Sequence, residues 1–469
     1  MDAVPPEAGA PATRVDTLVE AARRLTEGAD AAYRLGARAR EVARKRSGPD
    51  RLLADWDRIL EDENMRIAMI SQHASPLAAP GAEDAGGQNT HVAELASALT
   101  VAGHDVRVYT RRDSPALPEA VDAPDGYQVC HVPAGPARRV PKADLLPYTG
   151  EFGGRLADTW RRGGWTPDVA HAHFWTSGLA TVHASRRTGV PTVLTYHSLG
   201  TVKRRHQGVP DTGPPGRAGY ERALGRAVDR VVVQCSDEVA ELVRMGVPRS
   251  RMALVPSGVN EAVFRPDGPV APRDPARPRI LTVGRMVERK GFLDVVRALP
   301  AVPDAECVVV GGPPAHLLPA DTFARRLSAL ADSCGVADRV RLLGGVPREE
   351  MAAWYRSADV LVAAPWYEPF GLTPLEGMAC GVPVIGTNVG GIADSVVDGL
   401  TGDLVPPRDP RALGTALRRL LGDNVRRFAY ATAALDRIRS RYSWKRCAEQ
   451  LGAVYGTLTS AARPTPAVA

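Results

Sequence analysis

The sequence lacks several features that would assign it to a particular class of protein. No hydrophobic stretch approaches the ~20 residues that span a membrane, and the segment MDAVPPEAGAPATRVD has neither the charged start nor the apolar run of a signal peptide. The six cysteines form no C-x-x-C pair and follow no metal-ligand spacing. We therefore expect a cytoplasmic protein with reduced thiols, without a disulfide framework and without a metal site.

Lysine and aromatic residues are scarce. Only five of the 59 basic residues are lysines, aromatic residues make up 5% of the chain, and charges of both signs are interspersed to give a net charge of +6. The excess of arginine is typical of a GC-rich genome and forms no continuous basic block. No nucleic-acid partner is expected, because such a partner needs a basic face, often with interleaved aromatic residues.

The remaining composition is that of an ordinary globular protein, with 44% hydrophobic and 24% charged residues in 469 positions. At roughly 150 residues per domain, this length suggests about three units. Composition and pattern indicate a helical N-terminal arm, a first α/β domain, a proline-rich linker, a second α/β domain, and a last helix with a loose tail. The expected ranges are 1–64, 65–264, 265–279, 280–442 and 443–469, in that order.

Strand-like and helical patterns alternate in both α/β domains. The runs RIAMISQ and HDVRVYTR in the first domain, and RILTVGR and AECVVVGG in the second, are short and hydrophobic, with helical patterns between them. This alternation predicts the α/β fold class, with two Rossmann-like, doubly wound parallel sheets. Ligands of such sheets bind at the carboxyl ends of the strands, so two facing sheets would form a cleft where two substrates meet.

The segment EPFGLTPLE carries the strongest local signal. It places Glu368 in a loop after an expected strand and Glu376 about one turn inside the next helix. Both carboxylates can face the strand-end crevice and accept hydrogen bonds from the hydroxyls of a sugar or a ribose. Gly371 lets the backbone come close to a ligand, and exposed amides at the helix start suit phosphate or hydroxyl groups. The alternative is one solvated glutamate and one helix-capping glutamate.

The segment GRMVERKG follows the first expected strand of the second domain. It places Arg285 and Lys290 on a loop that leads into a helix. Two cations that converge on a diphosphate would stabilise it as a leaving group. Two ordinary surface charges are the alternative, although lysine is rare enough here to make Lys290 the more informative of the two.

A glycine-rich loop follows the first strand of the first domain. In AEDAGGQNTHV, Gly86 and Gly87 precede a helix for which Asn89 is the expected N-cap. Such a helix start can bind an anion. The loop is not a complete G-x-G-x-x-G fingerprint, so a dinucleotide site is not indicated, and a simple helix-entry turn is the alternative.

Histidines follow two neighbouring strands of the first domain. His171 and His173 alternate along one strand and share a face, but no third metal ligand stands at a recognisable spacing, so a structural or substrate-contacting role is favoured. His197 ends the next strand and is a candidate for contacting a reacting sugar, with a buried core histidine as the alternative. The chain has no Walker A loop, G-x-S-x-G elbow or H-E-x-x-H motif, which argues against an ATPase and against hydrolases of those types.

Together these motifs resemble those of the retaining GT-B glycosyltransferases of glycosyltransferase family 4. The E-x7-E pair, the GR-x4-K pair and the GGQN loop match that family's motifs, and the resemblance covers about residues 65–457. The segments SPLAAPGAEDAGGQN, HAHFWTSG, TYHSLGTVK and GPARRVPKADL are similar to those of the D-inositol 3-phosphate glycosyltransferases of mycothiol biosynthesis. Phe174 stands where that group has Tyr, and Ser198 where it has Thr. The HSLG and GGQ strings also resemble sucrose-phosphate and sucrose synthases.

The resemblance implies roles for individual residues. Those expected to bind the nucleotide-sugar donor are Gly87, Arg285, Lys290, Glu368, Phe370, Gly371, Leu372 and Glu376. Those expected to face the acceptor are Asn89, Lys142, Phe174, Ser198 and Lys203. Arg285 and Lys290 would hold the diphosphate, and Glu376 the ribose. The catalytic candidates are His197 and Glu368, which would contact the donor sugar near the reaction centre.

The resemblance also implies an activity, that of a retaining, metal-independent hexosyltransferase that needs no cofactor. It would transfer GlcNAc or glucose from a nucleoside-diphosphate sugar, with UDP favoured, to a small polar acceptor such as a cyclitol, a sugar or a sugar phosphate. The acceptor hydroxyl would attack from the face that the diphosphate leaves. Two alternatives stay open, a transfer like that of sucrose-phosphate synthase and a non-catalytic nucleotide-sugar-binding protein. The expected partners are the small-molecule donor and acceptor, and the sequence leaves a homodimer open.

Overall fold

The computed structural model describes residues 37–38, 64–78, 86–207 and 214–462. The chain divides into two compact units, Met1–Asn64 and Met65–Ala469. The described residues of the first unit are Ala37 and Arg38, which are helical, and Asn64. The rest of the predicted arm, and the predicted tail beyond 462, lie outside the described residues.

The second unit contains two sheets, of which the first has eight strands in the order β3-β4-β2-β1-β5-β6-β7-β8. These strands are β1 (Arg66–Ile70), β2 (Asp105–Arg111), β3 (Ala120–Asp122), β4 (Gln128–Val132), β5 (Val169–His173), β6 (Thr192–Thr195), β7 (Arg230–Val233) and β8 (Met252–Leu254). All neighbours pair in parallel except the edge strand β3, which pairs antiparallel with β4. The sequence pattern did not predict β3, because three half-exposed residues carry no hydrophobic run.

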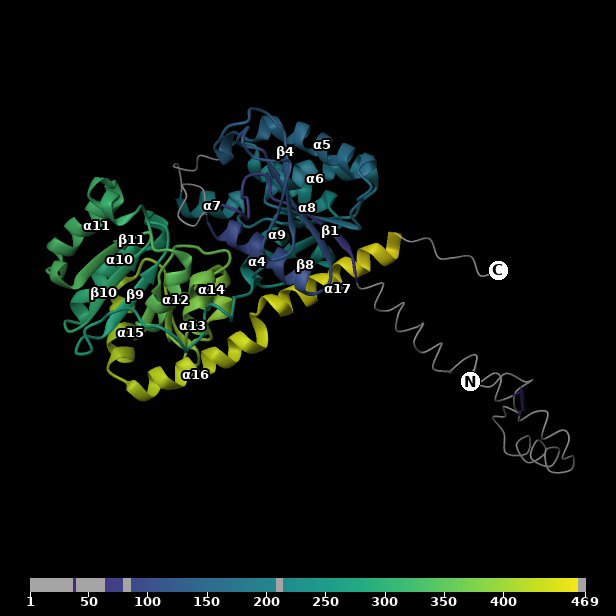
Figure 1. The fold of residues 1–469 in the computed structure, drawn as a ribbon. Coiled ribbons are helices and arrows are strands. Elements are labelled where there is room, and N and C mark those ends of the chain that lie inside the picture. The colour runs from purple at the N-terminus through teal and green to yellow at the C-terminus, as the bar shows by residue number, and fades with distance from the viewer. Residues whose placement is uncertain (1–36, 39–63, 79–85, 208–213, 463–469) are drawn as a thin grey trace, which may run out of the picture. The chain divides into compact units, whose positions relative to one another are not determined.

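Helices cover both faces of the first sheet (Figure 1). They are α4 (Gly87–Val101), α5 (Thr149–Arg162), α6 (Trp175–Thr188), α7 (Gly200–Gln207), α8 (Arg217–Ala227) and α9 (Ser236–Arg244). Successive residues of β1 face opposite sides of the sheet, so Ile67 packs in the core beneath α4 while Ala68 packs with α5 and α6. Both faces of the strand are therefore buried, as expected for a parallel sheet with helices on each side.

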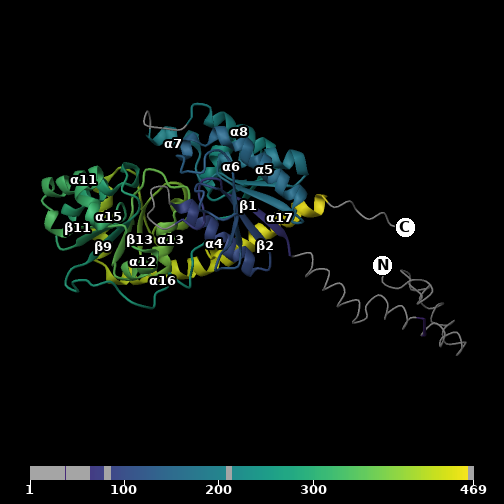
Figure 2. The same cartoon turned by 45° about the horizontal axis from the view of Figure 1, so that its top comes forward.

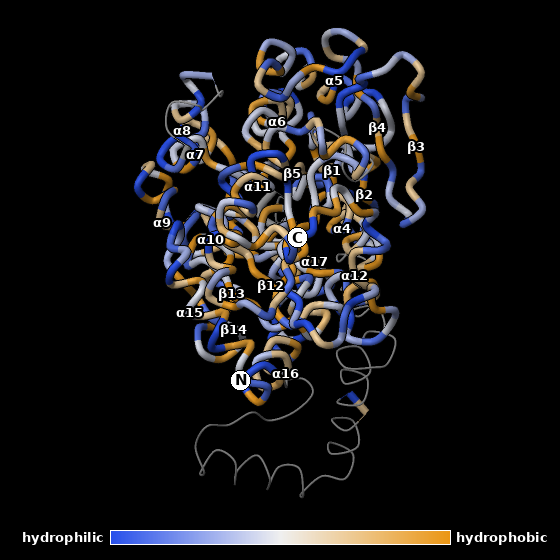
Figure 3. The backbone as a smooth tube through the Cα atoms, turned by 90° about the vertical axis from the view of Figure 1, so that its left-hand side faces the viewer, coloured by the Kyte–Doolittle hydropathy of each residue, from blue (hydrophilic) through white to orange (hydrophobic). Residues whose placement is uncertain are grey.

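The second sheet has six strands, all parallel, in the order β11-β10-β9-β12-β13-β14. The strands are β9 (Arg279–Val283), β10 (Glu306–Val310), β11 (Val340–Gly344), β12 (Val360–Ala363), β13 (Val384–Thr387) and β14 (Gly402–Val405). The helices are α10 (Phe292–Ala298), α11 (Thr322–Ser333), α12 (Arg348–Arg356), α13 (Leu372–Ala379), α14 (Gly390–Ser395) and α15 (Pro410–Leu421). Along β9, Ile280 and Leu281 enter two different cores, so this sheet is also buried on both faces. Hydrophobic residues accordingly recur along the strands (Figure 3).

The two sheets are linked twice by the chain. Residues 265–278 form no helix or strand and lead from the first sheet to β9. The chain returns through α16 (Asn424–Arg441), which packs on α13, and α17 (Trp444–Ala462), which packs on α4 (Figures 1 and 2). Trp444, Leu451 and Tyr455 of α17 belong to the same core as Ile67 of β1. The predicted α/β architecture with two doubly wound sheets is confirmed.

Among the described residues, no helix is both long and apolar enough to cross a membrane. All six cysteines are free thiols.

Candidate active site

A cavity of about 740 Å³ is lined by loops from the carboxyl ends of the strands of both sheets. Every residue that the sequence singled out for donor or acceptor binding lies on its wall. These are Gly87, Asn89, Lys142, Phe174, His197, Ser198, Lys203, Arg285, Lys290, Glu368, Phe370, Gly371, Leu372 and Glu376. These predicted residues lie up to 289 positions apart in the sequence, from Gly87 to Glu376.

Glu368 lies in the loop after β12 and forms an ion pair with Lys290, from the loop after β9. Burial alone would raise the pKa of Glu368, but the positive charges of Lys290 and Arg289 hold it below the ordinary value. The carboxylate is therefore ionised and acts only as a hydrogen-bond acceptor. Such a group suits the hydroxyls of a sugar.

Glycines shape the loop that carries Glu368. Gly371 has a φ of 72° and is the N-cap of α13, a conformation that residues with a side chain rarely adopt. At Gly390, an added Cβ would lie 2.2 Å from the carbonyl oxygen of Glu368. The backbone of α14 can therefore approach this loop only because position 390 has no side chain.

Glu376 lies on α13 and is held by two partners. The Tyr355 hydroxyl donates to Glu376 Oε2 at 2.7 Å, and Arg348 Nη1 lies 3.5 Å from Oε1. Burial raises the pKa of Glu376, and the positive charge of Arg348 opposes this rise. Glu376 lines the cavity, so this fixed carboxylate is available to a bound ligand.

Arg348 is a residue that the sequence did not single out. It is the first residue of α12, and its Nη2 donates at 2.9 Å to Glu94 of α4, which belongs to the first sheet. Arg348 therefore joins the carboxylate of Glu376 to the domain on the other side of the cavity. The sequence signal that could have identified Arg348 was its place after a parallel strand and at a helix start. Arginine is so common in this chain that this signal was not distinctive.

The loop after β9 supplies positive charge to the cavity. Arg285 and Lys290 both line it, as predicted from the GR-x4-K spacing, and Arg289 lies between them on the same wall. The Arg289 guanidinium lies 5.2 Å from the centre of the Tyr367 ring, at a distance typical of a cation–π contact. Three cations on one loop favour a ligand with a negative charge.

Helix α4 begins earlier than predicted, and the assignment of Asn89 as its N-cap is wrong. Gly86 is the N-cap, and Asn89 lies in the first turn, where its Oδ1 accepts from the Gly86 backbone N–H at 3.0 Å. Asn89 Nδ2 donates to the Ser75 carbonyl at 2.9 Å. The helix extends to Gly87 because this reciprocal bond satisfies a backbone amide that the helix start leaves without a partner.

Gly87 brings the first domain close to the start of α13. A Cβ at this position would lie 3.7 Å from the Leu372 side chain and 3.9 Å from that of Phe370. The glycine-rich loop and the start of α13 therefore face each other across the cavity.

The wall formed by the first domain contains a further cation, Arg217, that the sequence analysis missed. Arg217 Nη2 donates to Ser198 Oγ at 3.1 Å and to the Ser198 carbonyl at 2.7 Å, and Arg217 Nε pairs with Glu221 at 2.7 Å. Lys142 and Lys203 line the same cavity. No local motif marks Arg217, which becomes visible only when α8 folds against the loop after β6.

Phe174 follows β5 and is the N-cap of α6, with an unusual backbone conformation. Its φ is 82°, the ring is almost completely buried, and the Arg217 guanidinium lies 5.0 Å from the ring centre. The His73 ring packs against the Phe174 ring in an edge-to-face arrangement, with centroids 4.8 Å apart. A positive φ at an aromatic residue is strained and is tolerated where the surroundings enforce it, as at binding sites.

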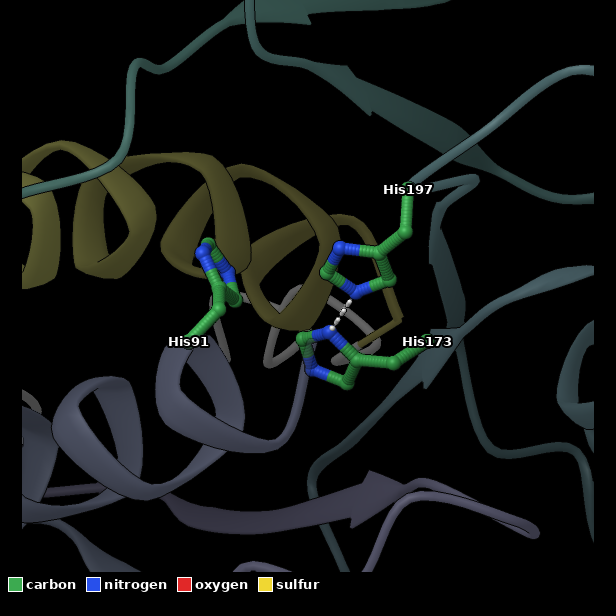
Figure 4. Close-up of side chains that lie close together, drawn as sticks. All are labelled: His91, His173 and His197. Carbon is green, nitrogen blue, oxygen red and sulfur yellow. Dashed lines mark hydrogen bonds between the residues drawn. The ribbon is translucent and has the colours of Figure 1, made fainter. Parts of the chain in front are cut away.

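The histidines form a buried cluster beneath the cavity. His171 is structural: Nδ1 lies 2.6 Å from the Tyr455 hydroxyl and Nε2 2.8 Å from Thr195 Oγ1. His173 Nδ1 and His197 Nε2 are hydrogen-bonded at 2.8 Å (Figure 4). His197 lines the cavity, whereas His171 and His173 do not.

His91 of α4 joins this cluster, which is the one group of described residues with the ligand types and spacing for a metal ion. Its ring lies beside those of His173 and His197 (Figure 4), and its Nδ1 lies 3.1 Å from Ser257 Oγ. His173 and His197 use one nitrogen each in their mutual bond, and the remaining nitrogen of each ring points away from that bond. Two such rings cannot bind one ion without breaking the bond, so the cluster fits a hydrogen-bonded pair better than a metal centre.

Comparison with known proteins identifies this arrangement. A family model described as "Glycosyltransferase Family 4" matches residues 85–263, and one described as "Glycosyl transferases group 1" matches residues 269–436. The D-inositol 3-phosphate glycosyltransferase of Xylanimonas cellulosilytica is 38% identical over 84% of this chain and 97% of its own length. The chain belongs to glycosyltransferase family 4.

Another relative and two solved structures are also similar to this chain. D-inositol 3-phosphate glycosyltransferase 1 of Catenulispora acidiphila is 36% identical over 86% of this chain and 98% of its own. The solved sucrose-phosphate synthase of Thermosynechococcus elongatus is 32% identical, with a TM-score of 0.77 over 85% of this chain and 100% of its own. Anabaena HepE, solved in complex with UDP and glucose, shares the fold at 16% identity, with a TM-score of 0.63 and coverage of 84% and 100%.

Membership confirms the resemblance and the GT-B fold that the sequence predicted. This family 4 glycosyltransferase is a retaining enzyme that uses a nucleotide sugar, and its cavity lies between two sheets of the GT-B type.

Proposed function

We propose that this family 4 glycosyltransferase transfers GlcNAc or glucose from a UDP-sugar to a small phosphorylated acceptor, a cyclitol phosphate or a sugar phosphate. The observation that carries the proposal is the placement of Glu368, Glu376, Arg285 and Lys290 around one cavity, with Lys142, Lys203 and Arg217 at its other end. Two groups of cations, one from each domain, suit a substrate pair in which both partners carry phosphate.

The donor would lie against the second domain. Arg285 and Lys290 offset the negative charge that the diphosphate gains as it leaves. The ionised Glu368, with the backbone of Phe370, Gly371 and Leu372 at the start of α13, holds the sugar hydroxyls. Glu376, fixed by Tyr355, accepts from the ribose hydroxyls.

The acceptor would lie against the first domain, with its phosphate between Lys142, Ser198 and Arg217. One of its hydroxyls then attacks the anomeric carbon from the face that the diphosphate leaves, and the proton passes to a departing phosphate oxygen. No side-chain nucleophile is needed. The carboxylates of Glu368 and Glu376 are already engaged, the first by Lys290 and the second by Arg348 and Tyr355. We propose that two cations at the diphosphate make a metal ion unnecessary.

The donor site is tested by binding and turnover across UDP-, GDP- and ADP-sugars. We expect Glu376→Ala to lower the affinity for the preferred donor by about tenfold or more, because hydrogen bonds to a charged group are worth roughly 1.5–3 kcal/mol. Glu288→Ala, on the rim of the same cavity, is the matched control and should bind the donor normally. Unchanged affinity in Glu376→Ala would contradict the assignment, and binding without turnover for any acceptor would favour the non-catalytic alternative.

Of the two proposed acceptor classes, one is a sugar phosphate, as in a transfer like that of sucrose-phosphate synthase. Phe174 favours it over inositol phosphate, because a phenyl ring cannot donate the hydrogen bond that a tyrosine at this position could. Turnover should be compared for inositol phosphates and hexose phosphates in the wild type and in Phe174→Tyr. Preference of the wild type for hexose phosphates, shifted toward inositol phosphate in Phe174→Tyr, would support the sugar-phosphate assignment. Preference of the wild type for inositol phosphate would contradict it, and an unchanged preference in the variant would contradict the role of Phe174.

A further inference from the structure

His173 and His197 form a pair of hydrogen-bonded imidazoles at the ends of β5 and β6. His173 Nδ1 and His197 Nε2 are 2.8 Å apart (Figure 4). His173 is completely buried, while His197 is 5% exposed and lines the cavity. The pair therefore connects the interior of the first domain to the site.

Both rings are uncharged. Burial, followed by the neighbouring histidines, holds the pKa of each well below the ordinary value. A neutral imidazole carries a single N–H, so the pair has two, of which one lies in the shared bond. The other must lie on His173 Nε2 or on His197 Nδ1, and within the described part of the chain neither of these buried nitrogens has a partner.

The surroundings decide between these two nitrogens. His173 packs against the His171 ring, with centroids 4.4 Å apart, and is out of reach of a substrate. His197 faces the cavity and has an uncommon positive φ of 60°. A buried N–H without an acceptor is costly, whereas a buried lone pair is tolerated more often. Both nitrogens are buried, but only the ring of His197 borders the cavity, so we place the N–H without a partner on His197, where an oxygen of a bound ligand would lie nearer.

We propose that His173 is a positioning residue that donates its Nδ1 hydrogen to His197 Nε2 and thereby places the proton of His197 on Nδ1. His197 then acts as a neutral hydrogen-bond donor to an oxygen of the donor sugar, and no proton is transferred. This role rests on the proposed function, since it needs a donor sugar in the cavity. The rings of His91 and Phe370, with centroids 5.0 and 5.1 Å from that of His197, hold the imidazole in place.

The first test needs no substrate. Nitrogen-15 NMR of the full chain, labelled at histidine, reports which ring nitrogen carries the proton, and comparison with His197→Asn assigns the signal. We expect His197 to be protonated at Nδ1 in the wild type and to lose this fixed state in His173→Phe. His171→Phe removes an equally buried imidazole from the same strand and should leave the His197 signal in the Nδ1–H form. Protonation of His197 at Nε2 in the wild type would overturn the proposal, whether or not any donor is turned over.

The second test uses the UDP-sugar that the wild type turns over. His173→Phe should lower kcat/KM for this donor by about tenfold, the effect of losing one hydrogen bond in the transition state. His173→Asn should recover most of it, because the asparagine amide can donate from the position of Nδ1. Equal losses in the two variants, with normal thermal unfolding of the Asn variant, would show that His173 only fills space and would overturn the proposal.

Discussion

Asp394 accepts two hydrogen bonds from Ser236, one from the backbone N–H and one from Oγ, both at 2.6 Å. Ser236 is the first residue of α9 beside the first sheet, and Asp394 lies on α14 beside the second. A helix leaves its first amides without partners and favours a negative charge there. A carboxylate of one domain thus caps a helix of the other, near the cavity that both domains line.

This cap is expected to stabilise the arrangement of the two domains. Ser236→Ala and Asp394→Ala should each lower the free energy of unfolding by about 1 kcal/mol, the usual value of a helix cap. The double variant should lose clearly less than the sum, because the two residues share one interaction. Chemical denaturation of the four proteins measures this coupling. Additive losses would mean that the contact contributes nothing in solution.

Arg348 is expected to support donor binding through Glu376. Arg348→Gln should raise the KM for the donor by about tenfold, because Glu376 loses a charged partner that fixes its orientation. Glu94→Gln is the matched control: it weakens the contact to the first domain and leaves the contact to Glu376 in place, so its KM should change less. Steady-state kinetics distinguish the two. Equal changes in both variants would instead assign the effect to domain contact, and no change in either would refute the role of Arg348.

The absence of a side chain at position 390 is expected to matter for activity. Gly390→Ala should destabilise the protein by more than about 1 kcal/mol and reduce turnover, because the new Cβ meets the Glu368 carbonyl and the residue has a positive φ. Gly335→Ala is the control, since Gly335 also has a positive φ but has nothing within 4 Å of the added carbon. Thermal unfolding and kcat together measure the difference. Equal effects at both sites would show that the contact with Glu368 relaxes without consequence.

Buried histidines should make the fold sensitive to acid. Burial lowers the pKa of His91 and His171 from 6.5 to about 3, so between these values the unfolded chain binds more protons than the folded one. Stability therefore falls as the pH is lowered from about 7 toward 5, by at most about 1.4 kcal/mol per pH unit for each histidine. Glu238, whose pKa burial raises to about 7, acts in the opposite direction.

A comparison of variants isolates the histidine contribution. The free energy of unfolding in urea should fall less steeply with pH in His171→Phe than in the wild type. His183→Gln removes an exposed histidine of α6 and should keep the slope of the wild type. If the three slopes were equal, the buried histidines would not be the source of the acid sensitivity.

Features that lie within one short segment could be predicted from the sequence. The alternation of hydrophobic strands with helices gave the two sheets, because burial on both faces leaves continuous runs such as RILTV. Glu368 and Glu376 follow one strand, and Lys290 follows its neighbour in the sheet, so the topology alone places them at one edge. Their individual roles stay predictions.

Features that depend on packing between distant segments could not be predicted. Arg348 pairs with Glu94 across 254 positions, and nothing in either segment indicates the other. His91 reaches the histidine cluster only because it lies on the buried face of α4. Edge strands such as β14 have few residues and little pattern. The start of α4 depends on a hydrogen bond from the Gly86 N–H to Asn89 Oδ1, whereas an N-cap asparagine would accept from an amide two or three residues further on.

The return of the chain through α17 has a consequence for synthesis. Tyr455 and Leu451 fill the same core as Ile67 and Leu95, yet the ribosome makes them only after the whole second sheet. The apolar surface that α17 covers in the first domain therefore stays exposed while the second domain is translated and can already fold. Contacts between such distant positions form late and slow folding, and an uncovered core is prone to aggregation. The helix that ties the domains together thus also sets the order in which they mature.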